Sequence, residues 1–183
     1  MLSRRQPDLT VVLENIHDPH NVSAILRSCD AVGVLRAHAV YSLEAPPPGA
    51  FARQTSASAA KWVEVERHDS VASCFAKLRG EGFRMLVTSL GSGSRSLYAW
   101  DLTGPTALVL GNEMRGVSDE ASELADGAIA IPMLGMVQSL NVSVAGAVCL
   151  YEALRQRLAA GTYETARISD NRLRALEEDW LRR

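Results

Sequence analysis

Four polar side chains interrupt an otherwise apolar segment in the C-terminal part of the chain, GMVQSLNVSVAGAVC at positions 135–149. They are Gln138, Ser139, Asn141 and Ser143. A hydrogen-bonding group that is buried without a partner costs about 1–3 kcal/mol, so a purely structural core helix gives no reason for four of them. These side chains therefore either face a ligand or cap a helix.

Helix capping explains only part of this pattern. Pro132 and Gly135 free backbone groups just before the polar residues, which indicates a loop that leaves a strand. Ser139 or Asn141 can then cap a helix that begins near Val142. Capping uses one or two of the four polar side chains and leaves the others unexplained. We therefore expect this loop and helix N-terminus to suit a small ligand with polar ends.

A second candidate site follows the apolar run Thr106–Leu110 (TALVL), which is typical of a buried parallel strand. Gly111 lets a ligand or another backbone segment approach closely. Glu113 could be an ordinary surface carboxylate, but its position directly after a buried strand favours a place in a site. Ser118 is predicted to cap the helix that comes next.

A third candidate is Arg27, on a predicted helix from Val22 to Ala31. Asn21 or Ser23 can cap the start of this helix, and Gly33 stands where a left-handed residue ends one. The apolar side chains of the helix fall on one side, and Arg27 points the other way. It is either a solvated arginine or an arginine displayed at the carboxyl edge of a sheet, where open α/β folds bind ligands.

Two other motifs give weaker evidence for a binding site. Residues 91–96 (GSGSRS) begin like a dinucleotide fingerprint, but the third glycine position is Ser96 and no helix follows, so we predict a flexible loop. His17 and His20 could form half of a metal site, but no third ligand lies within reach in sequence, and Pro19 more simply shapes a turn. No metal is expected.

The composition is that of a soluble globular protein. Of 183 residues, 47% are hydrophobic and 22% charged, and no apolar run approaches the length of a membrane span. The N-terminus lacks the apolar stretch of a signal peptide, and Cys29, Cys74 and Cys149 lie far apart among apolar residues. We therefore expect a cytoplasmic protein with reduced thiols and neither disulfides nor a zinc site. The net charge of −2 neither requires nor excludes a nucleic-acid partner.

Strands and helices alternate along the chain and must position these candidates. Strands are predicted at Leu9–Glu14, Ala37–Tyr41, Trp62–Glu66, Met85–Leu90, Thr106–Leu110 and Ala128–Ile131, with further helices at Val71–Leu78, Val142–Ala159 and Ser169–Arg183. Ser42–Ala60, with its PPPG sequence, is a long connection. This order predicts an α/β fold on a mainly parallel sheet flanked by helices. Residues 1–161 would form one domain and residues 162–183 a C-terminal helical extension.

Three segments together identify the family. NVSAILRSCDAVGV, LVLGNEMRGVSDE and IPMLGMVQSLNVSVAGAV resemble, in order and spacing, the three motifs of the SpoU/TrmH branch of the SPOUT RNA methyltransferases. HDPHN before the first motif, RQTS followed by KWV, and LYEALRQRLAAGTY after the third add to the likeness. The resemblance runs over nearly the whole chain and is strongest to members that methylate a guanosine ribose in the tRNA D-loop.

The resemblance implies a deep trefoil knot in the C-terminal part of the fold, which holds S-adenosylmethionine. The matching positions for the cofactor are Thr88, Gly111, Ile131, Met133, Gly135 and Leu140. It also implies a homodimer with the active site near the subunit interface, where the small residues Ser143, Ala145, Gly146 and Ala147 would allow close helix packing. tRNA is the implied partner, and no membrane is involved.

The implied catalytic set is Arg27, Asn21, Glu113, Ser139 and Asn141. A ribose 2′-hydroxyl is a weak nucleophile until its proton leaves, so a general base is expected. The family's proposed base is the arginine that matches Arg27, yet arginine is essentially always protonated in proteins. Two readings stay open: Arg27 accepts the proton transiently in a water-free site, or it binds phosphate and stabilises the developing alkoxide. Asn21, Glu113 and Asn141 would orient Arg27.

Other functions are weighed against this one. Within the family, the target could be ribosomal RNA or the tRNA anticodon loop, and outside it the chain could bind RNA without methylating it. An intact Arg27, Glu113 and Asn141 favour an enzyme. Relatives usually carry a basic helix before the first strand, and here only Ser3-Arg4-Arg5 stands there. Because contacts to the RNA backbone dominate affinity, weaker tRNA binding is expected.

Overall fold

A computed structural model describes residues 1–43 and 59–182 of the chain. Seven strands form one sheet in the order β3-β2-β1-β6-β4-β7-β5, and every pairing between them is parallel. The strands are β1 (Leu9–Glu14), β2 (Arg36–Val40), β3 (Glu64–His68), β4 (Arg84–Thr88), β5 (Arg95–Ser96), β6 (Thr106–Leu110) and β7 (Gly127–Ala130). The prediction of an α/β fold on a parallel sheet is confirmed.

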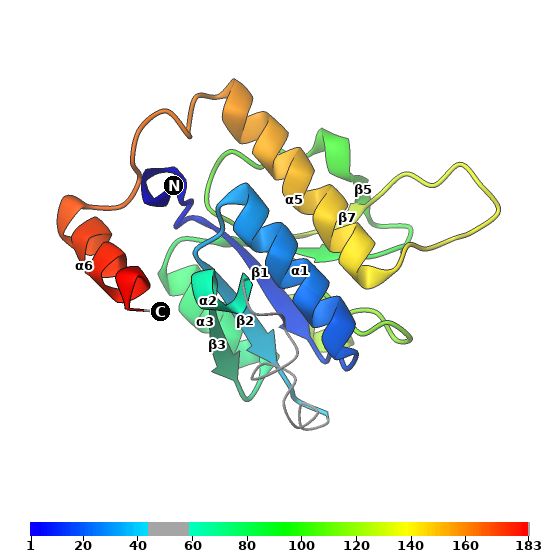
Figure 1. The fold of residues 1–183 in the computed structure, drawn as a ribbon. Coiled ribbons are helices and arrows are strands. Elements are labelled where there is room, and N and C mark those ends of the chain that lie inside the picture. Colours follow the sequence, from blue (N-terminus) through cyan, green and yellow to red (C-terminus); the bar gives the residue numbers. More distant parts are fainter. Residues whose placement is uncertain (44–58, 183) are drawn as a thin grey trace.

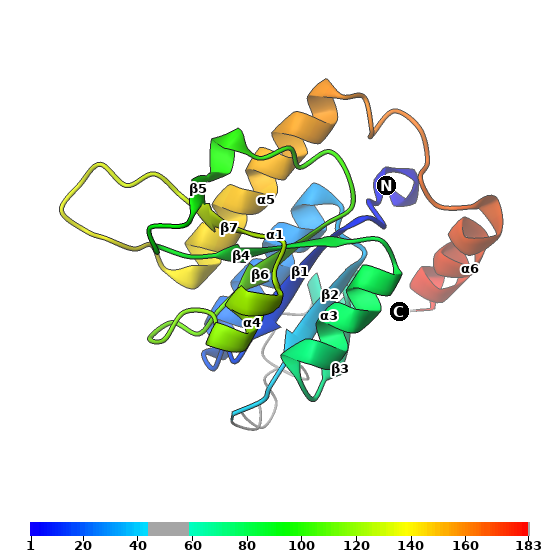
Figure 2. The ribbon, with the colours of Figure 1, turned by 180° about the vertical axis from the view of Figure 1, so that it is seen from behind.

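Helices cover both faces of the sheet (Figures 1 and 2). One face carries α1 (Pro19–Val32), α2 (Ala59–Trp62) and α5 (Val142–Ala159), and the other carries α3 (Val71–Gly80) and α4 (Asp119–Leu124). Alternation along β1 explains the two layers, because successive side chains of a strand point to opposite faces. Leu13 packs into the core with α1 and α5, whereas Val12 packs into the core with α3.

The predicted boundaries of β1, β6 and α5 agree with the structure at both ends of each element. The strand predicted from Trp62 is wrong at its start: Ala59–Trp62 form one helical turn, and β3 begins at Glu64. The loop predicted at residues 91–96 contains β5, a two-residue edge strand that pairs with β7. So short a strand leaves no periodicity to recognise. The PPPG and RQTS sequences lie outside the described residues.

The start of α1 differs from its prediction. Asp18, and not Asn21 or Ser23, is the N-cap, and its carboxylate accepts a 2.8 Å hydrogen bond from the backbone N–H of His20. Pro19 occupies the first helical position, where its fixed φ suits the helix and its missing N–H costs nothing. Asn21 therefore lies inside the helix, with its side chain available for other contacts. The predicted end is confirmed, because Gly33 has a φ of 87°.

Helix α5 begins as predicted and packs very closely on the sheet. Asn141 is its N-cap, accepting a 2.8 Å bond from the backbone N–H of Ser143. A Cβ atom at Gly146 would lie 2.8 Å from Leu110 Cδ1 of β6, so a larger residue there would displace the Leu110 side chain. The assignment of Gly146 to subunit packing is therefore wrong: the residue is buried inside its own chain.

The C-terminal helix α6 (Asp170–Leu181) lies beside the N-terminal 3₁₀ turn η1 (Leu2–Arg4), as Figure 1 shows. Trp180 holds it there. The Trp180 ring lies 4.9 Å from that of Trp62, and the Arg5 guanidinium stands 4.8 Å above the Trp180 ring. Both contacts are favourable for an aromatic side chain. The division of the chain at Gly161 stays a prediction.

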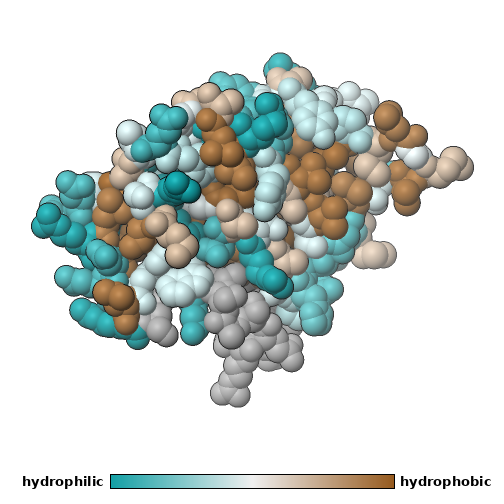
Figure 3. Space-filling model, turned by 45° about the horizontal axis from the view of Figure 1, so that its top comes forward, coloured by the Kyte–Doolittle hydropathy of each residue, from teal (hydrophilic) through white to brown (hydrophobic). Residues whose placement is uncertain are grey.

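The loop between β7 and α5 projects from the body of the molecule (Figure 1) and exposes apolar side chains. Leu134 and Met136 are fully exposed and Val137 largely so, and on α5 Val144 and Tyr151 are also exposed. Figure 3 shows hydrophobic surface extending from α5 onto this loop. Among the described residues, no helix is both long and apolar enough to cross a membrane.

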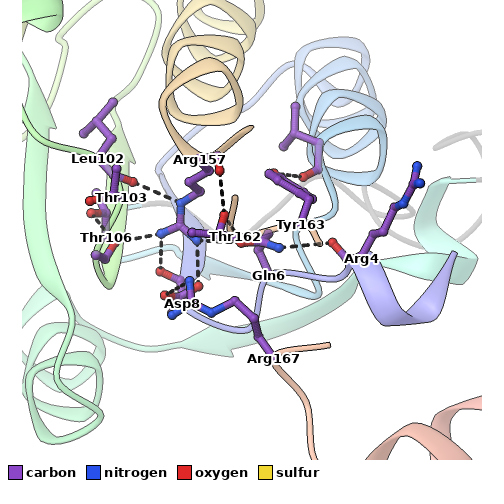
Figure 4. A network of polar contacts seen from close by, with 12 residues as sticks. Arg4, Gln6, Asp8, Leu102, Thr103, Thr106, Arg157, Thr162, Tyr163 and Arg167 are labelled. Carbon is purple, nitrogen blue, oxygen red and sulfur yellow. Dashed lines mark hydrogen bonds and ion pairs between the residues drawn. The ribbon is translucent and has the colours of Figure 1, made fainter. Parts of the chain in front are cut away.

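A buried arginine joins the two ends of the domain (Figure 4). The Arg157 side chain on α5 is fully buried and donates five hydrogen bonds. Two reach Asp8, at its carboxylate (2.6 Å) and its backbone carbonyl (3.1 Å), and the others reach the Gln6 side chain and the carbonyls of Leu102 and Gly104. Because a buried charge is tolerated only when it is fully paired, these contacts fix α5 against the start of β1.

Candidate active site

A cavity of about 690 Å³ opens at the carboxyl ends of β4, β6 and β7. Most of its lining comes from four stretches that follow these strands or lead into α5: Thr88–Leu90, Gly111–Val117, Ile131 with Met133, and Gln138–Val142. The carboxyl edge is where open parallel sheets bind ligands. Polar and apolar side chains contribute about equally to the lining, which suits a ligand that carries both apolar and polar groups.

Five of the six predicted cofactor residues line this cavity: Thr88, Gly111, Ile131, Met133 and Leu140. Gly135 is not in the lining, and its assignment to the cofactor stays a prediction. It is exposed and belongs to the loop between β7 and α5. The sequence pattern marked Gly135 as part of a ligand loop but gave no information on how far the loop extends from the sheet.

Three predicted catalytic residues meet at the edge of the cavity. The Asn21 side-chain amide donates a 2.9 Å hydrogen bond to Glu113 Oε1, and its carbonyl accepts a 3.1 Å bond from Asn141 Nδ2. Asn21 is buried and thus bridges two residues that line the cavity. An amide suits this position because it offers a donor and an acceptor on one rigid group.

The four polar residues of the 135–149 segment are divided between capping and the cavity. Asn141 caps α5 and also accepts a 2.6 Å bond from Ser143 Oγ. Gln138 and Ser139 are exposed and line the cavity. The apolar character of the segment suggested a buried position, but most of it lies on the surface, so these groups bear no burial cost.

Arg27 is not brought to this group of residues. Its side chain is exposed, is absent from the cavity lining, and forms no hydrogen bond or ion pair within residues 1–43 and 59–182. Six residues separate it from Asn21, which on a helix corresponds to about 9 Å along the axis and a different face. The prediction that Asn21, Glu113 and Asn141 orient Arg27 is therefore not met within one chain.

A tight loop after β6 presents Glu113 to the cavity. A Cβ atom at Gly111 would lie 2.1 Å from the backbone carbon of Gly116, so Gly111 allows the loop to close on itself. The side chain of Asn112 holds the turn. Its Oδ1 accepts hydrogen bonds from the backbone N–H groups of Met114 (2.9 Å) and Arg115 (3.1 Å), and its Nδ2 donates one to the backbone carbonyl of Asn15 (2.8 Å). Sequence reasoning missed Asn112, although Asn after a strand is a common turn signal.

Glu14 is a second residue that sequence reasoning missed. It ends β1, is almost fully buried, and accepts a 3.0 Å hydrogen bond from the backbone N–H of Ser118, the N-cap of α4. The loop from Gly111 to Ser118 is thus anchored at both ends. A carboxylate inside a buried apolar strand was the signal, because such a group must find a partner.

Tyr41 lies near the same edge of the sheet. Its hydroxyl donates a 3.0 Å hydrogen bond to the Ile16 carbonyl. Burial raises the pKa of Tyr41 to about 12, and the negative charge of Glu113 adds to the rise. Tyr41 therefore stays a neutral hydrogen-bond donor at physiological pH and stiffens the loop that leads from β1 into α1.

Comparisons with known proteins agree with this arrangement. Residues 8–151 match the SpoU rRNA Methylase family. The tRNA (guanosine(18)-2′-O)-methyltransferase of Thermus thermophilus is 52% identical over 183 residues, which cover 100% of this chain and 93% of that protein. The crystal structure of the A. aeolicus TrmH/SpoU tRNA modifying enzyme superposes with a TM-score of 0.87 at 40% identity, covering 98% and 90% of the two chains.

A third comparison concerns the cofactor. The SpoU methyltransferase AviRb from Streptomyces viridochromogenes, solved in complex with AdoMet, superposes with a TM-score of 0.72 at 26% identity. The match covers 84% of this chain and 62% of that one.

Proposed function

Because the chain belongs to the SpoU rRNA methylase family, we propose that it methylates the ribose 2′-hydroxyl of guanosine 18 in the D-loop of tRNA. Its substrates are S-adenosylmethionine, as methyl donor, and tRNA. Similarity over the full chain to an enzyme of this name supports the proposal. The observation that carries it is the cavity at the carboxyl edge of the sheet, with Glu113, Ser139 and Asn141 in its wall.

The residues of the cavity fit the cofactor. Leu90, Ile131, Met133 and Leu140 offer apolar contact for an adenine ring, and Thr88 and Ser139 offer hydrogen bonds to polar ends. The volume of about 690 Å³ is in the range of small-molecule sites. When bound, S-adenosylmethionine supplies an electrophilic methyl group on a sulfonium sulfur. We propose that these residues would hold it beside Glu113 and Asn141, which line the same cavity.

The chemical step needs an activated and well-placed ribose. The 2′-oxygen would attack the methyl carbon in line, the carbon–sulfur bond would break with release of S-adenosylhomocysteine, and the hydroxyl proton would pass to solvent. In this proposal the bridge from Asn21 to Glu113 and Asn141 holds the wall of the site rigid, so that the two reacting atoms are aligned. Ser139 contributes a hydrogen bond at the same wall.

Arg27 serves the RNA side of the reaction. Its guanidinium is exposed and uncommitted within the described chain, and a guanidinium binds phosphate through paired N–H groups. Because arginine stays protonated, we propose that Arg27 reaches the site of the second chain in a homodimer, where it binds an RNA phosphate and stabilises the developing alkoxide, and that it does not act as a base.

Two finer features of the family belong to the proposal. A trefoil knot is supported by the path of the chain: after β7, which lies near the sheet edge, α5 returns to the middle of the sheet and packs on β6 and α1. A homodimer is supported by the exposed apolar side chains of Leu134, Met136 and Val137, and a second chain would cover them. A cytoplasmic location follows from a tRNA substrate.

The test is transfer of a labelled methyl group to an unmodified tRNA transcript. A matched transcript lacks only the 2′-hydroxyl of guanosine 18, and an Arg27→Ala enzyme is the protein control. We expect label on the first transcript alone and loss of the label with Arg27→Ala. Equal labelling of both transcripts would move the target to another nucleotide of tRNA. Labelling of ribosomal RNA and not of tRNA would overturn the proposal.

A further inference from the structure

A cluster of metal-binding side chains lies far from the cavity, at the β3-β2 edge of the sheet. It consists of His38 on β2, His68 at the end of β3 and Cys74 on α3. None of the three lines the cavity described above. They are separated in the sequence, and no spacing motif predicts their meeting.

The parallel register of β2 and β3 brings the two histidines together. His38 pairs with Glu66 and Val40 with His68, so the side chains of His38, Glu66 and His68 project from the same face of the sheet. His38 Nδ1 lies 2.9 Å from His68 Nε2. Helix α3 covers this face and places Cys74 above the pair. One ligand atom from each of these three residues falls within 4.8 Å of the others.

The donor set and its burial select the kind of ligand. His38 and Cys74 are fully buried, and the side chain of His68 is 8% exposed. Two imidazole nitrogens and a thiolate suit zinc and related borderline ions, which bind four ligands tetrahedrally, and not magnesium or calcium, which prefer oxygen. The Glu66 carboxylate lies 3.7 Å from His68 Nε2 and can supply a further ligand oxygen.

We propose that His38, His68 and Cys74 bind one zinc ion that fastens α3 to the β2-β3 edge of the sheet, with Glu66 as the fourth ligand. Both facing ring nitrogens then present lone pairs to the metal, so the proton between them moves to the far nitrogen of its own ring. The Cys74 thiol loses its proton to solvent. Glu66 now contacts Lys77 and lies 3.5 Å from Arg36, and it exchanges these contacts for the metal. The site is structural and independent of methyl transfer.

Cobalt(II) gives a direct test, because it occupies zinc sites and reports its ligands by absorption. The full chain is freed of metal with a chelator, kept reduced with a phosphine, and titrated with cobalt chloride. We expect one equivalent to produce visible bands of tetrahedral cobalt and a near-ultraviolet thiolate charge-transfer band. Added zinc should remove both and raise the melting temperature.

Three variants decide whether the cluster is the site. Cys74→Ala should lose the charge-transfer band, whereas Cys149→Ala, which removes another buried thiol on the opposite layer, should keep it. If Cys74→Ala does not fold, His68→Gln at the rim of the cluster provides the same test through loss of the visible bands. An unchanged spectrum in Cys74→Ala and His68→Gln, or no spectrum in the unmodified chain, would overturn the proposal and leave a hydrogen-bonded histidine pair.

Discussion

The side chain of Asn21 donates a 2.9 Å hydrogen bond to Glu113, 92 residues away in the sequence. Its side-chain carbonyl accepts a 3.1 Å hydrogen bond from Asn141, which belongs to a third segment. One buried amide thus ties together the helix after β1, the loop after β6 and the start of α5. Since Glu113 and Asn141 both line the cavity, the rigidity of its wall depends on a residue that does not itself line it.

Asn21→Ala should therefore impair catalysis while leaving the fold intact. The change leaves two polar partners without their bonds, which costs about 1–3 kcal/mol. If this cost falls on the transition state, kcat/KM for methyl transfer drops by about 10- to 100-fold. Ser23→Ala, on the same helix, is the control and should stay near the unmodified value. Equal kcat/KM for the two variants would show that the bridge has no catalytic role.

Arg27→Ala should abolish most of the activity without changing stability. The side chain is exposed and unpaired within the described residues, so the free energy of unfolding should change by less than about 0.5 kcal/mol. Loss of a group that stabilises developing charge lowers kcat by about 100- to 1,000-fold. Arg27→Lys keeps the charge and should retain part of the activity. An unchanged kcat at saturating tRNA in Arg27→Ala would contradict the proposed role.

Gly111→Ala should weaken cofactor binding. The added Cβ would stand 2.1 Å from the Gly116 backbone, so the loop that forms one wall of the cavity must open. We expect the calorimetric Kd for S-adenosylmethionine to rise by at least about tenfold, which is 1.4 kcal/mol. Gly80→Ala is a matched control, because a Cβ there meets no atom within 4 Å. If both variants bind the cofactor equally well, the closed loop is not needed for the site.

Arg157→Met should strongly destabilise the fold. It removes five hydrogen bonds and leaves the Asp8 carboxylate, now 2.6 Å from the guanidinium, with less compensation in a largely buried place. Removing one partner of a buried ion pair costs about 3–5 kcal/mol. Arg182→Met breaks an ion pair in which both side chains, Arg182 and Glu178, are exposed, and it should cost less than about 1 kcal/mol. Urea unfolding of both variants measures the difference, and equal midpoints would refute it.

Alkaline pH should reduce stability in part through Cys149. Burial raises the pKa of this thiol from 9.0 to about 12. Because the folded pKa lies above the unfolded one, the contribution is complete below pH 9 and is lost as the pH rises toward 12. Between pH 8 and pH 10 the unfolding free energy should fall by about 1.4 kcal/mol, because the Cys149 thiol ionises in the unfolded chain and stays protonated in the folded one.

The slope of the unfolding free energy against pH isolates the contribution of the Cys149 thiol. Cys149→Ala should show a shallower fall over the same interval, even though its stability at pH 7 is lower because of the cavity left in the core. Val148→Ala perturbs the packing of a neighbouring residue without removing a titrating group, so it should keep the original slope. Parallel curves for all three proteins would mean that the Cys149 thiol does not contribute.

The sequence by itself determined the local features of this protein. A β-rich run marked β1 and a continuous apolar run marked β6. Gly33, Ser118 and Asn141 stood at helix ends, where their conformational and hydrogen-bonding preferences place them. Such features depend on residues a few positions apart. The three motifs in their order also identified the family, and with it five of the residues that line the cavity.

The tertiary structure alone decided which distant residues meet. The order β3-β2-β1-β6-β4-β7-β5 places Asn21 against Glu113, Asp8 against Arg157, and His38 against His68. Patterns along the chain cannot specify these pairs, because strand order and register are set by packing of the whole sheet between its helices. For the same reason the sequence did not show that Arg27 lies outside the cavity lining, or that Gly146 faces β6 of its own chain.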